Sequence, residues 1–194
     1  EEVGLKLGSK SVMITYHPET RQPGENLQNL DSVLRALDLF PDAQLIFTGS
    51  NADENGRIFN KVIADYVDKN KRRAVFHKSL GQDLFLSTLR LTKGLIGNSS
   101  SGIIEAPSLA VGTVNIGSRQ SGRIRGHTVI DSVSSVESIA EGVKTLLTGQ
   151  LGGRLKDASN PYFQENSSEK VILGLKSYTF DNSNNKPFYD VSYI

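Results

Sequence analysis

A run of small polar residues, Gly97-Asn98-Ser99-Ser100-Ser101-Gly102, is the segment of this chain best suited to hold an anion. Small side chains leave the backbone uncovered, and where such a loop begins a helix, its free N–H groups and the helix dipole favour negative charge. Serine hydroxyls add hydrogen-bond donors, and Glu105, one turn further on, can accept hydrogen bonds from vicinal sugar hydroxyls. A serine helix cap that binds no ligand is the alternative that these residues leave open.

His17 and three arginines are further candidates for contact with phosphate. His17 directly follows an apolar run, a position that usually opens into a crevice, where an imidazole can titrate near neutral pH or donate to a phosphate. Arg119, Arg123 and Arg125 lie among glycines, and guanidinium groups bind phosphate through paired hydrogen bonds. A structural histidine and solvated surface arginines are the corresponding alternatives.

The composition excludes several other kinds of chemistry. The chain has 194 residues, no Cys and three His, so disulfides, thiolate nucleophiles and Cys-type zinc sites are excluded, and we expect no metal centre. Its net charge is +1, whereas general nucleic-acid binding depends on a clear excess of Lys and Arg, so we expect no nucleic-acid partner. No segment approaches the roughly 18 consecutive apolar residues that a membrane-spanning helix requires, so we expect no membrane association.

Apolar runs alternate with segments of helical periodicity along most of the chain, which predicts an α/β fold. Strands are predicted at residues 11–16, 43–47, 74–76, 94–97, 113–116 and 128–130. Helices are predicted between them, including one over 103–109 that begins in the serine-rich loop. Right-handed crossovers then give a Rossmann-like parallel sheet with helices on both faces. We expect one domain over residues 1–180 and a polar tail over 181–194.

The strand order decides whether the candidate residues meet. In the commonest doubly wound order, 3-2-1-4-5-6, the first and fourth strands are neighbours, and ligands bind outside their carboxyl ends. If this order holds, the loop that carries His17 and the serine-rich loop lie side by side. The sequence therefore predicts a binding site at this edge of the sheet.

Four segments, taken together and in order, resemble the hydrolysing UDP-N-acetylglucosamine 2-epimerases. They are His17-Pro18, the loop Asn51-Ala52-Asp53, the serine-rich loop with Glu105, and the segment 115–123. The resemblance covers about residues 10 to 180. Non-hydrolysing epimerases carry a more acidic loop in place of the serine-rich one, which favours the hydrolysing branch.

The resemblance implies a GT-B fold, in which the active site lies between two Rossmann-like domains. This chain resembles the C-terminal domain only, which agrees with its length and with Glu1 in place of an initial Met. By the resemblance, the backbone of Leu80 and the ring of Phe85 border the uracil, and Glu105 holds the ribose. The residues implied at the diphosphate and the sugar are Ser99, Ser100, Gly102, Arg119, His17 and Asn51.

The implied reaction is anti elimination of UDP from UDP-GlcNAc to give a 2-acetamidoglucal, followed by hydration to free ManNAc. Such a step belongs to sialic- or legionaminic-acid-type biosynthesis in the cytoplasm and needs no metal or redox cofactor. Elimination requires a base at C2 and stabilisation of the departing diphosphate, and this chain suits the second task, with His17 as proton donor or phosphate ligand. The acid and base carboxylates would lie in the N-terminal domain, so we expect this chain alone to bind UDP weakly and turn over nothing.

The expected partners are the UDP-sugar, the N-terminal domain of the same enzyme and, in the full-length protein, a second copy in a homodimer. The substrate is either UDP-GlcNAc or a relative such as UDP-diacetylbacillosamine. Three other functions stay open: the nucleotide-binding half of a GT-B glycosyltransferase, a non-catalytic nucleotide-sugar sensor and an α/β-hydrolase. The last rests on a near match of the serine-rich loop to the G-x-S-x-G nucleophile elbow, in which Ser101 occupies the final glycine position.

Overall fold

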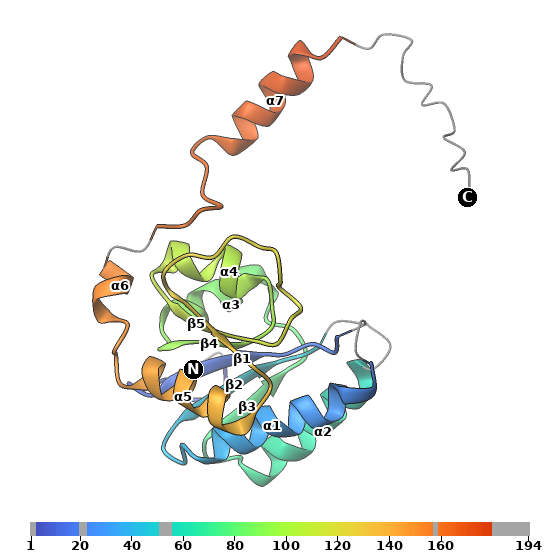
Figure 1. Cartoon of the computed structure of the whole chain (residues 1–194), viewed down its shortest axis with the longest axis vertical. Coiled ribbons are helices and arrows are strands. Elements are labelled where there is room, and N and C mark those ends of the chain that lie inside the picture. Colours follow the sequence, from blue (N-terminus) through green and yellow to red (C-terminus); the bar gives the residue numbers. More distant parts are fainter. Residues whose placement is uncertain (1–2, 20–22, 51–55, 157–158, 180–194) are drawn as a thin grey trace, which may run out of the picture. The chain divides into compact units, whose positions relative to one another are not determined.

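The apolar runs form the strands of one six-stranded parallel sheet (Figure 1). A computed structural model describes residues 3–19, 23–50, 56–156 and 159–179. The strands are β1 (Ser11–Thr15), β2 (Gln44–Thr48), β3 (Ala74–His77), β4 (Gly94–Gly97), β5 (Gly112–Ile116) and β6 (Val129–Ser132). Their order is β3-β2-β1-β4-β5-β6, so the predicted order and the Rossmann-like α/β fold are confirmed.

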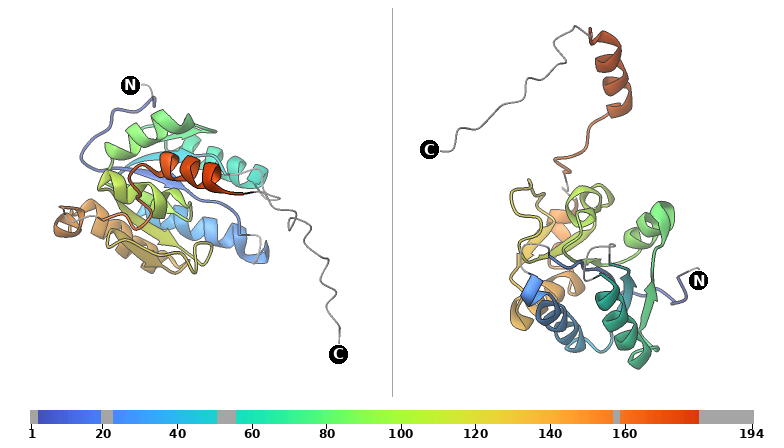
Figure 2. Two further views of the ribbon diagram at one scale, coloured as in Figure 1. Left: turned by 90° about the horizontal axis from the view of Figure 1, so that it is seen from above. Right: turned by 90° about the vertical axis from the view of Figure 1, so that its right-hand side faces the viewer.

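Helices cover both faces of the sheet because alternate strand residues point to opposite sides. The side chains of Val12 and Ile14 pack in the larger core, under α1 (Asn26–Asp38), α2 (Gly56–Lys69) and α5 (Val136–Leu147). Met13 points the other way, into a smaller core that includes Leu89 of α3 (Gly81–Arg90). The views in Figure 2 show the same two helical layers.

The helix predicted over residues 103–109 is wrong in its bounds. The chain instead forms a short α4 (Ser101–Ile104) and then the 3-10 helix η2 (Ala106–Leu109). Pro107 explains the break, because it has no N–H to continue the α-helical hydrogen bonds and lies at the start of η2. A four-residue helix has only a small dipole, so local N–H and hydroxyl groups must provide most of any attraction for an anion.

The chain divides into two units, residues 1–162 and 163–194. The first contains the sheet and the helices up to α6 (Gly152–Lys156). Within the second, α7 (Ser167–Ser177) has no buried residue. The predicted tail, 181–194, lies outside the described residues. Among the described helices, none is both long and apolar enough to cross a membrane.

Candidate functional site

Strands β1 and β4 end side by side. After β1 the chain enters the loop that carries His17, and after β4 it enters the serine-rich loop. Thr15 of β1 pairs with Gly97, the last residue of β4. Gly97 has φ of +138°, and a β-carbon there would overlap the Thr15 carbonyl oxygen. Only glycine allows the ends of β1 and β4 to lie this close together with such a backbone conformation at position 97.

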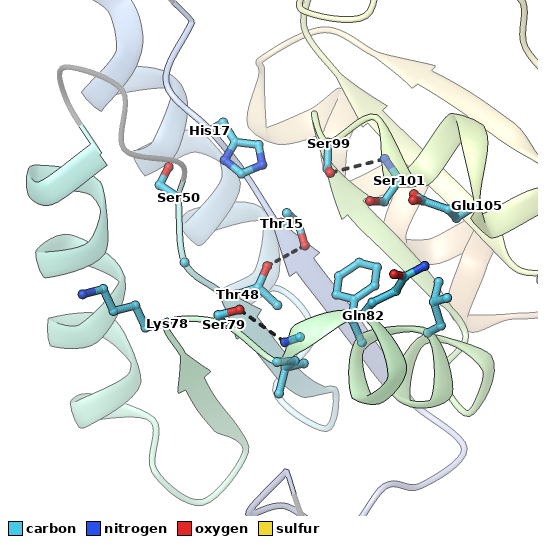
Figure 3. A pocket seen from close by; sticks show the side chains of 15 residues that line it. Thr15, His17, Thr48, Ser50, Lys78, Ser79, Gln82, Ser99, Ser101 and Glu105 are labelled. Atoms are coloured by element: carbon cyan, nitrogen blue, oxygen red, sulfur yellow. Dashed lines mark hydrogen bonds between the residues drawn. The ribbon is translucent and has the colours of Figure 1, made fainter. Parts of the chain in front are cut away.

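A cavity of about 460 Å³ lies at this edge of the sheet (Figure 3). Five of the predicted residues line it: His17, Leu80, Phe85, Ser99 and Glu105. They come from the loops after β1, β3 and β4, from the first turns of α3 and, for Glu105, from the C-terminal end of α4. The structure therefore brings together side chains that lie up to 88 positions apart in the sequence, from His17 to Glu105.

The other predicted residues lie beside the cavity or outside the described chain. Ser100 precedes α4 and does not line the cavity. Gly102 is buried against β5, where its carbonyl accepts a hydrogen bond from Thr113 Oγ1 at 2.8 Å. Arg119 is exposed, and its Nη1 donates to the Asn98 carbonyl at 3.2 Å, at the base of the serine-rich loop. Asn51 lies outside the described residues.

Several lining residues were not predicted from the sequence. The hydroxyls of Thr15 and Thr48 lie 2.7 Å apart and form part of the lining, and Lys78 adds a cation. Ser101, which belongs to the predicted serine-rich loop, also lines the cavity, and its N–H donates to the Ser99 hydroxyl at 3.3 Å (Figure 3). The positions of Thr15 and Thr48 at strand ends are a signal that could have identified them, because carboxyl ends of parallel strands meet at one edge.

Asn98 is a further residue of the site that was not predicted from the sequence. It is fully buried, and its side-chain amide binds the backbone of His17 in both directions, at 2.8 Å each. The sequence places Asn98 in the loop but gives no indication that its side chain reaches across to the loop after β1.

The three arginines of the segment after β5 have different environments. Arg125 forms an ion pair with Asp131, with Nε 2.9 Å from the carboxylate, and also donates to two backbone carbonyls. Arg123 is exposed. Arg119 is thus the arginine whose side chain contacts the serine-rich loop.

The residues around the cavity combine three kinds of surface. Leu80 and Phe85 offer apolar area for a flat ring, Glu105 offers an exposed carboxylate, and Ser99 and Ser101 offer hydroxyls. Such a lining suits a ligand with an aromatic base, vicinal hydroxyls and a phosphate. The fold and the site together define a Rossmann-like α/β protein with its cavity at the switch point of the sheet.

The comparisons with known proteins identify the family. A sequence profile of the UDP-N-acetylglucosamine 2-epimerase family matches residues 2–176, and the chain belongs to this family. It is 35% identical over 196 residues to the polysialic acid biosynthesis protein P7 of Escherichia coli, covering 98% of this chain and 50% of that protein. It is 32% identical over 177 residues to the hydrolysing UDP-N,N'-diacetylbacillosamine 2-epimerase of Legionella pneumophila, covering 91% of this chain and 45% of the relative.

Solved structures agree with the fold. The UDP-GlcNAc 2-epimerase from Neisseria meningitidis, bound to UDP-GlcNAc, superposes with a TM-score of 0.70 at 19% identity, over 87% of this chain and 45% of that one. The UDP complex of S. aureus MnaA gives 0.63 at 18% identity, over 87% and 46%. The chain thus spans about half the length, or less, of the relatives that it matches.

Proposed function

We propose that this chain is the UDP-binding half of a hydrolysing UDP-2-acetamido-sugar 2-epimerase. The observation that carries the proposal is the cavity in which Phe85, Glu105, Ser99 and His17 converge in a chain of this family. All these residues lie within the unit 1–162, inside the predicted nucleotide-binding domain.

The proposed arrangement follows the chemistry of the lining. The uracil lies against Leu80 and Phe85, and the ribose hydroxyls donate to Glu105. The diphosphate accepts hydrogen bonds from the serine-rich loop and from Arg119, whose guanidinium keeps further donors beyond the one bonded to Asn98. The sugar then extends toward His17, and Asn51 is assigned to the same side of the site.

The proposed reaction begins with removal of the C2 proton by a base and breakage of the C1–oxygen bond, which releases UDP and leaves a 2-acetamidoglucal. Water then adds across the double bond to give the free 2-epimeric sugar. The hydroxyls of the serine-rich loop and Arg119 stabilise the charge that develops on the departing diphosphate, and His17 donates a proton or a hydrogen bond to it. The base belongs to the partner N-terminal domain, and the reaction needs no metal or redox cofactor.

The choice of the hydrolysing reaction and of the substrate rests on the relatives. Two of them, from L. pneumophila and Campylobacter jejuni, are named as hydrolysing epimerases of N,N'-diacetylbacillosamine nucleotides. We therefore propose the hydrolysing reaction in sialic- or legionaminic-acid-type biosynthesis, with either UDP-GlcNAc or UDP-diacetylbacillosamine as substrate. A homodimer of the full-length protein is part of the same proposal.

The test uses the full-length protein that contains this chain, supplied with each UDP-sugar and no acceptor. We expect UDP and a free 2-epimeric sugar in equal amounts, and no turnover by the 194-residue chain alone. Formation of UDP-ManNAc would contradict the hydrolysing assignment, intact substrate would favour a sensor, and turnover only with an acceptor would favour a glycosyltransferase. Free sugar released by the pure 194-residue chain would contradict the assignment of the base to the other half.

A further inference from the structure

The loops after β1, β4 and β5 meet at the buried residue Asn98. Its backbone N–H donates to the Thr15 carbonyl at 3.2 Å, directly after the last paired residues of β1 and β4, Thr15 and Gly97. Beyond this point its side-chain amide continues the pairing. Oδ1 accepts from the His17 N–H, and Nδ2 donates to the His17 carbonyl, both at 2.8 Å.

This pair of hydrogen bonds has the pattern of a peptide group in a β-ladder. The pairing of β1 with β4 ends at Thr15 and Gly97, and the amide of Asn98 makes the next two hydrogen bonds to the backbone of His17. Among common side chains, only Asn and Gln offer one acceptor and two donors on a single planar group. The reach of Asn98 therefore fixes the backbone of His17 past the end of β1.

The backbone carbonyl of Asn98 performs a second task. It accepts from Arg119 Nη1 at 3.2 Å and from Gln120 Nε2 at 2.8 Å. Gln120 is also buried, so this contact anchors the loop after β5 in the interior. It thereby fixes the backbone from which the exposed Arg119 side chain extends. One residue thus holds the two groups that face the diphosphate in the proposed function, His17 and Arg119.

We propose that Asn98 is a positioning residue that holds His17 and Arg119 where both can contact the diphosphate. The inference rests on the proposed function for the identity of the ligand. It predicts that loss of the Asn98 amide weakens contact with the phosphates and leaves contact with the nucleoside unchanged, since Leu80, Phe85 and Glu105 make no hydrogen bond to Asn98 among the described contacts.

The chain contains a matched control. Asn26 is 4% exposed, and its amide binds the backbone of Glu19 in the same reciprocal way, at 2.7 and 3.1 Å. It therefore anchors the same loop as Asn98 with the same number of side-chain hydrogen bonds. Asn26→Ala reproduces the cost of losing a buried amide without removing the contact between the loops after β1 and β4.

The experiment compares the ¹⁵N-labelled chain with Asn98→Ala, Asn98→Asp and Asn26→Ala by NMR, with UDP and with uridine as ligands. We expect Asn98→Ala to weaken UDP binding about tenfold and uridine binding less than about twofold. Asn98→Asp keeps an acceptor for the His17 N–H, loses the donor and adds a negative charge near the phosphates, so UDP affinity falls further while uridine affinity is retained. Asn26→Ala leaves both affinities within about twofold of the original.

The signals of the free chain provide an independent readout. In Asn98→Ala and Asn98→Asp, the His17 amide signal shifts because the side chain that binds it is replaced. The Arg119 guanidinium binds the backbone carbonyl that both variants keep, so its signal shifts only as far as the loop moves, and in Asn26→Ala it does not shift. An unchanged His17 amide signal in a folded Asn98 variant, or equal losses of UDP and uridine affinity, would overturn the inference. Failure of the original chain to bind UDP would instead reject the proposed function, and the signals of the free chain would still decide the role of Asn98.

Discussion

The proposed contact of Glu105 with the ribose can be tested by changing its side chain and, separately, by removing the hydroxyls that it is proposed to bind. Its carboxylate is exposed in the cavity, one turn beyond the serine-rich loop. We predict that Glu105→Gln weakens UDP binding by about tenfold, because a carboxylate accepts hydrogen bonds from two vicinal hydroxyls more strongly than a neutral amide does.

The matched ligand is 2′,3′-dideoxy-UDP, which lacks those hydroxyls. For this ligand, the original chain and Glu105→Gln should have the same dissociation constant, measured by calorimetry or NMR titration. A similar loss of affinity for both ligands would show that Glu105 acts somewhere other than at the ribose.

Tyr16 gives a prediction for stability at high pH. It is 2% exposed and stacks on Phe59. Burial raises its pKa to about 12. A hydrogen bond with Ser134 acts against this by lowering the pKa, and the charge of Glu19 raises it further. In the unfolded chain the phenol ionises near pH 10, so between about pH 10 and 12 the folded state binds more protons and stability falls as the pH rises. The expected loss attributable to Tyr16 is roughly 2 to 3 kcal/mol across this window.

Urea unfolding at a series of pH values from 8 to 12 measures this dependence. Tyr16→Phe keeps the stacked ring and should flatten the dependence of stability on pH. The pKa of Tyr66 is also raised, mainly by burial, so Tyr66→Phe measures the contribution of that separate tyrosine. An identical slope in the original chain and in Tyr16→Phe would contradict the assigned pKa.

Residue types and neighbouring positions identified His17, Ser99 and Glu105 because their chemistry is visible in the local sequence. The resemblance to the epimerases added Leu80 and Phe85, and all five line one cavity. Asn98 was not identified because its role depends on hydrogen bonds to residues 81 positions away in the sequence, which no local pattern encodes. The site roles themselves stay predictions until a ligand is bound.

At the scale of elements, Gly97 is the position on which the close approach of β1 and β4 depends. We predict that Gly97→Ala destabilises the fold by more than about 2 kcal/mol, because the new methyl group overlaps the Thr15 carbonyl and φ of +138° strains any other residue. Gly152→Ala is the matched control, since that site in α6 has no atom within 4 Å of an added β-carbon.

Thermal and urea unfolding of both variants measure the effect. The Gly152→Ala change should stay within about 1 kcal/mol of the original chain, as expected for an exposed helical glycine. Equal stabilities for the two variants would mean that β1 and β4 can pack this closely without glycine at position 97.

The elements were more predictable than their ends. Continuous apolar runs gave all six strands, since strands buried on both faces carry apolar side chains at nearly every position, as Val12, Met13 and Ile14 do. The helix predicted over 103–109 was wrong in its bounds because apolar residues continue to Leu109, past Pro107, whose missing N–H interrupts the α-helical hydrogen bonds. Sequence periodicity reports which face is buried, and it does not report where the hydrogen-bond pattern changes.

At the scale of the whole molecule, the chain spans about half of the length of the relatives that it matches, or less, and every described residue that lines the cavity belongs to its first unit. We therefore propose that this chain binds the nucleotide and that turnover requires the other half of the protein, which would supply the base.

The most direct test of this account is an NMR titration of the 194-residue chain with UDP, with GDP and ADP as matched controls. NMR detects even millimolar binding, which corresponds to about 4 kcal/mol, so a half-site that binds weakly is still observed. We predict that UDP selectively shifts the signals of Leu80, Phe85, Arg119 and the segment 99–105, with much smaller shifts from the purine nucleotides. No shifts at millimolar UDP in a folded sample, or equal shifts from all three nucleotides, would contradict the proposal that this half holds the uridine diphosphate.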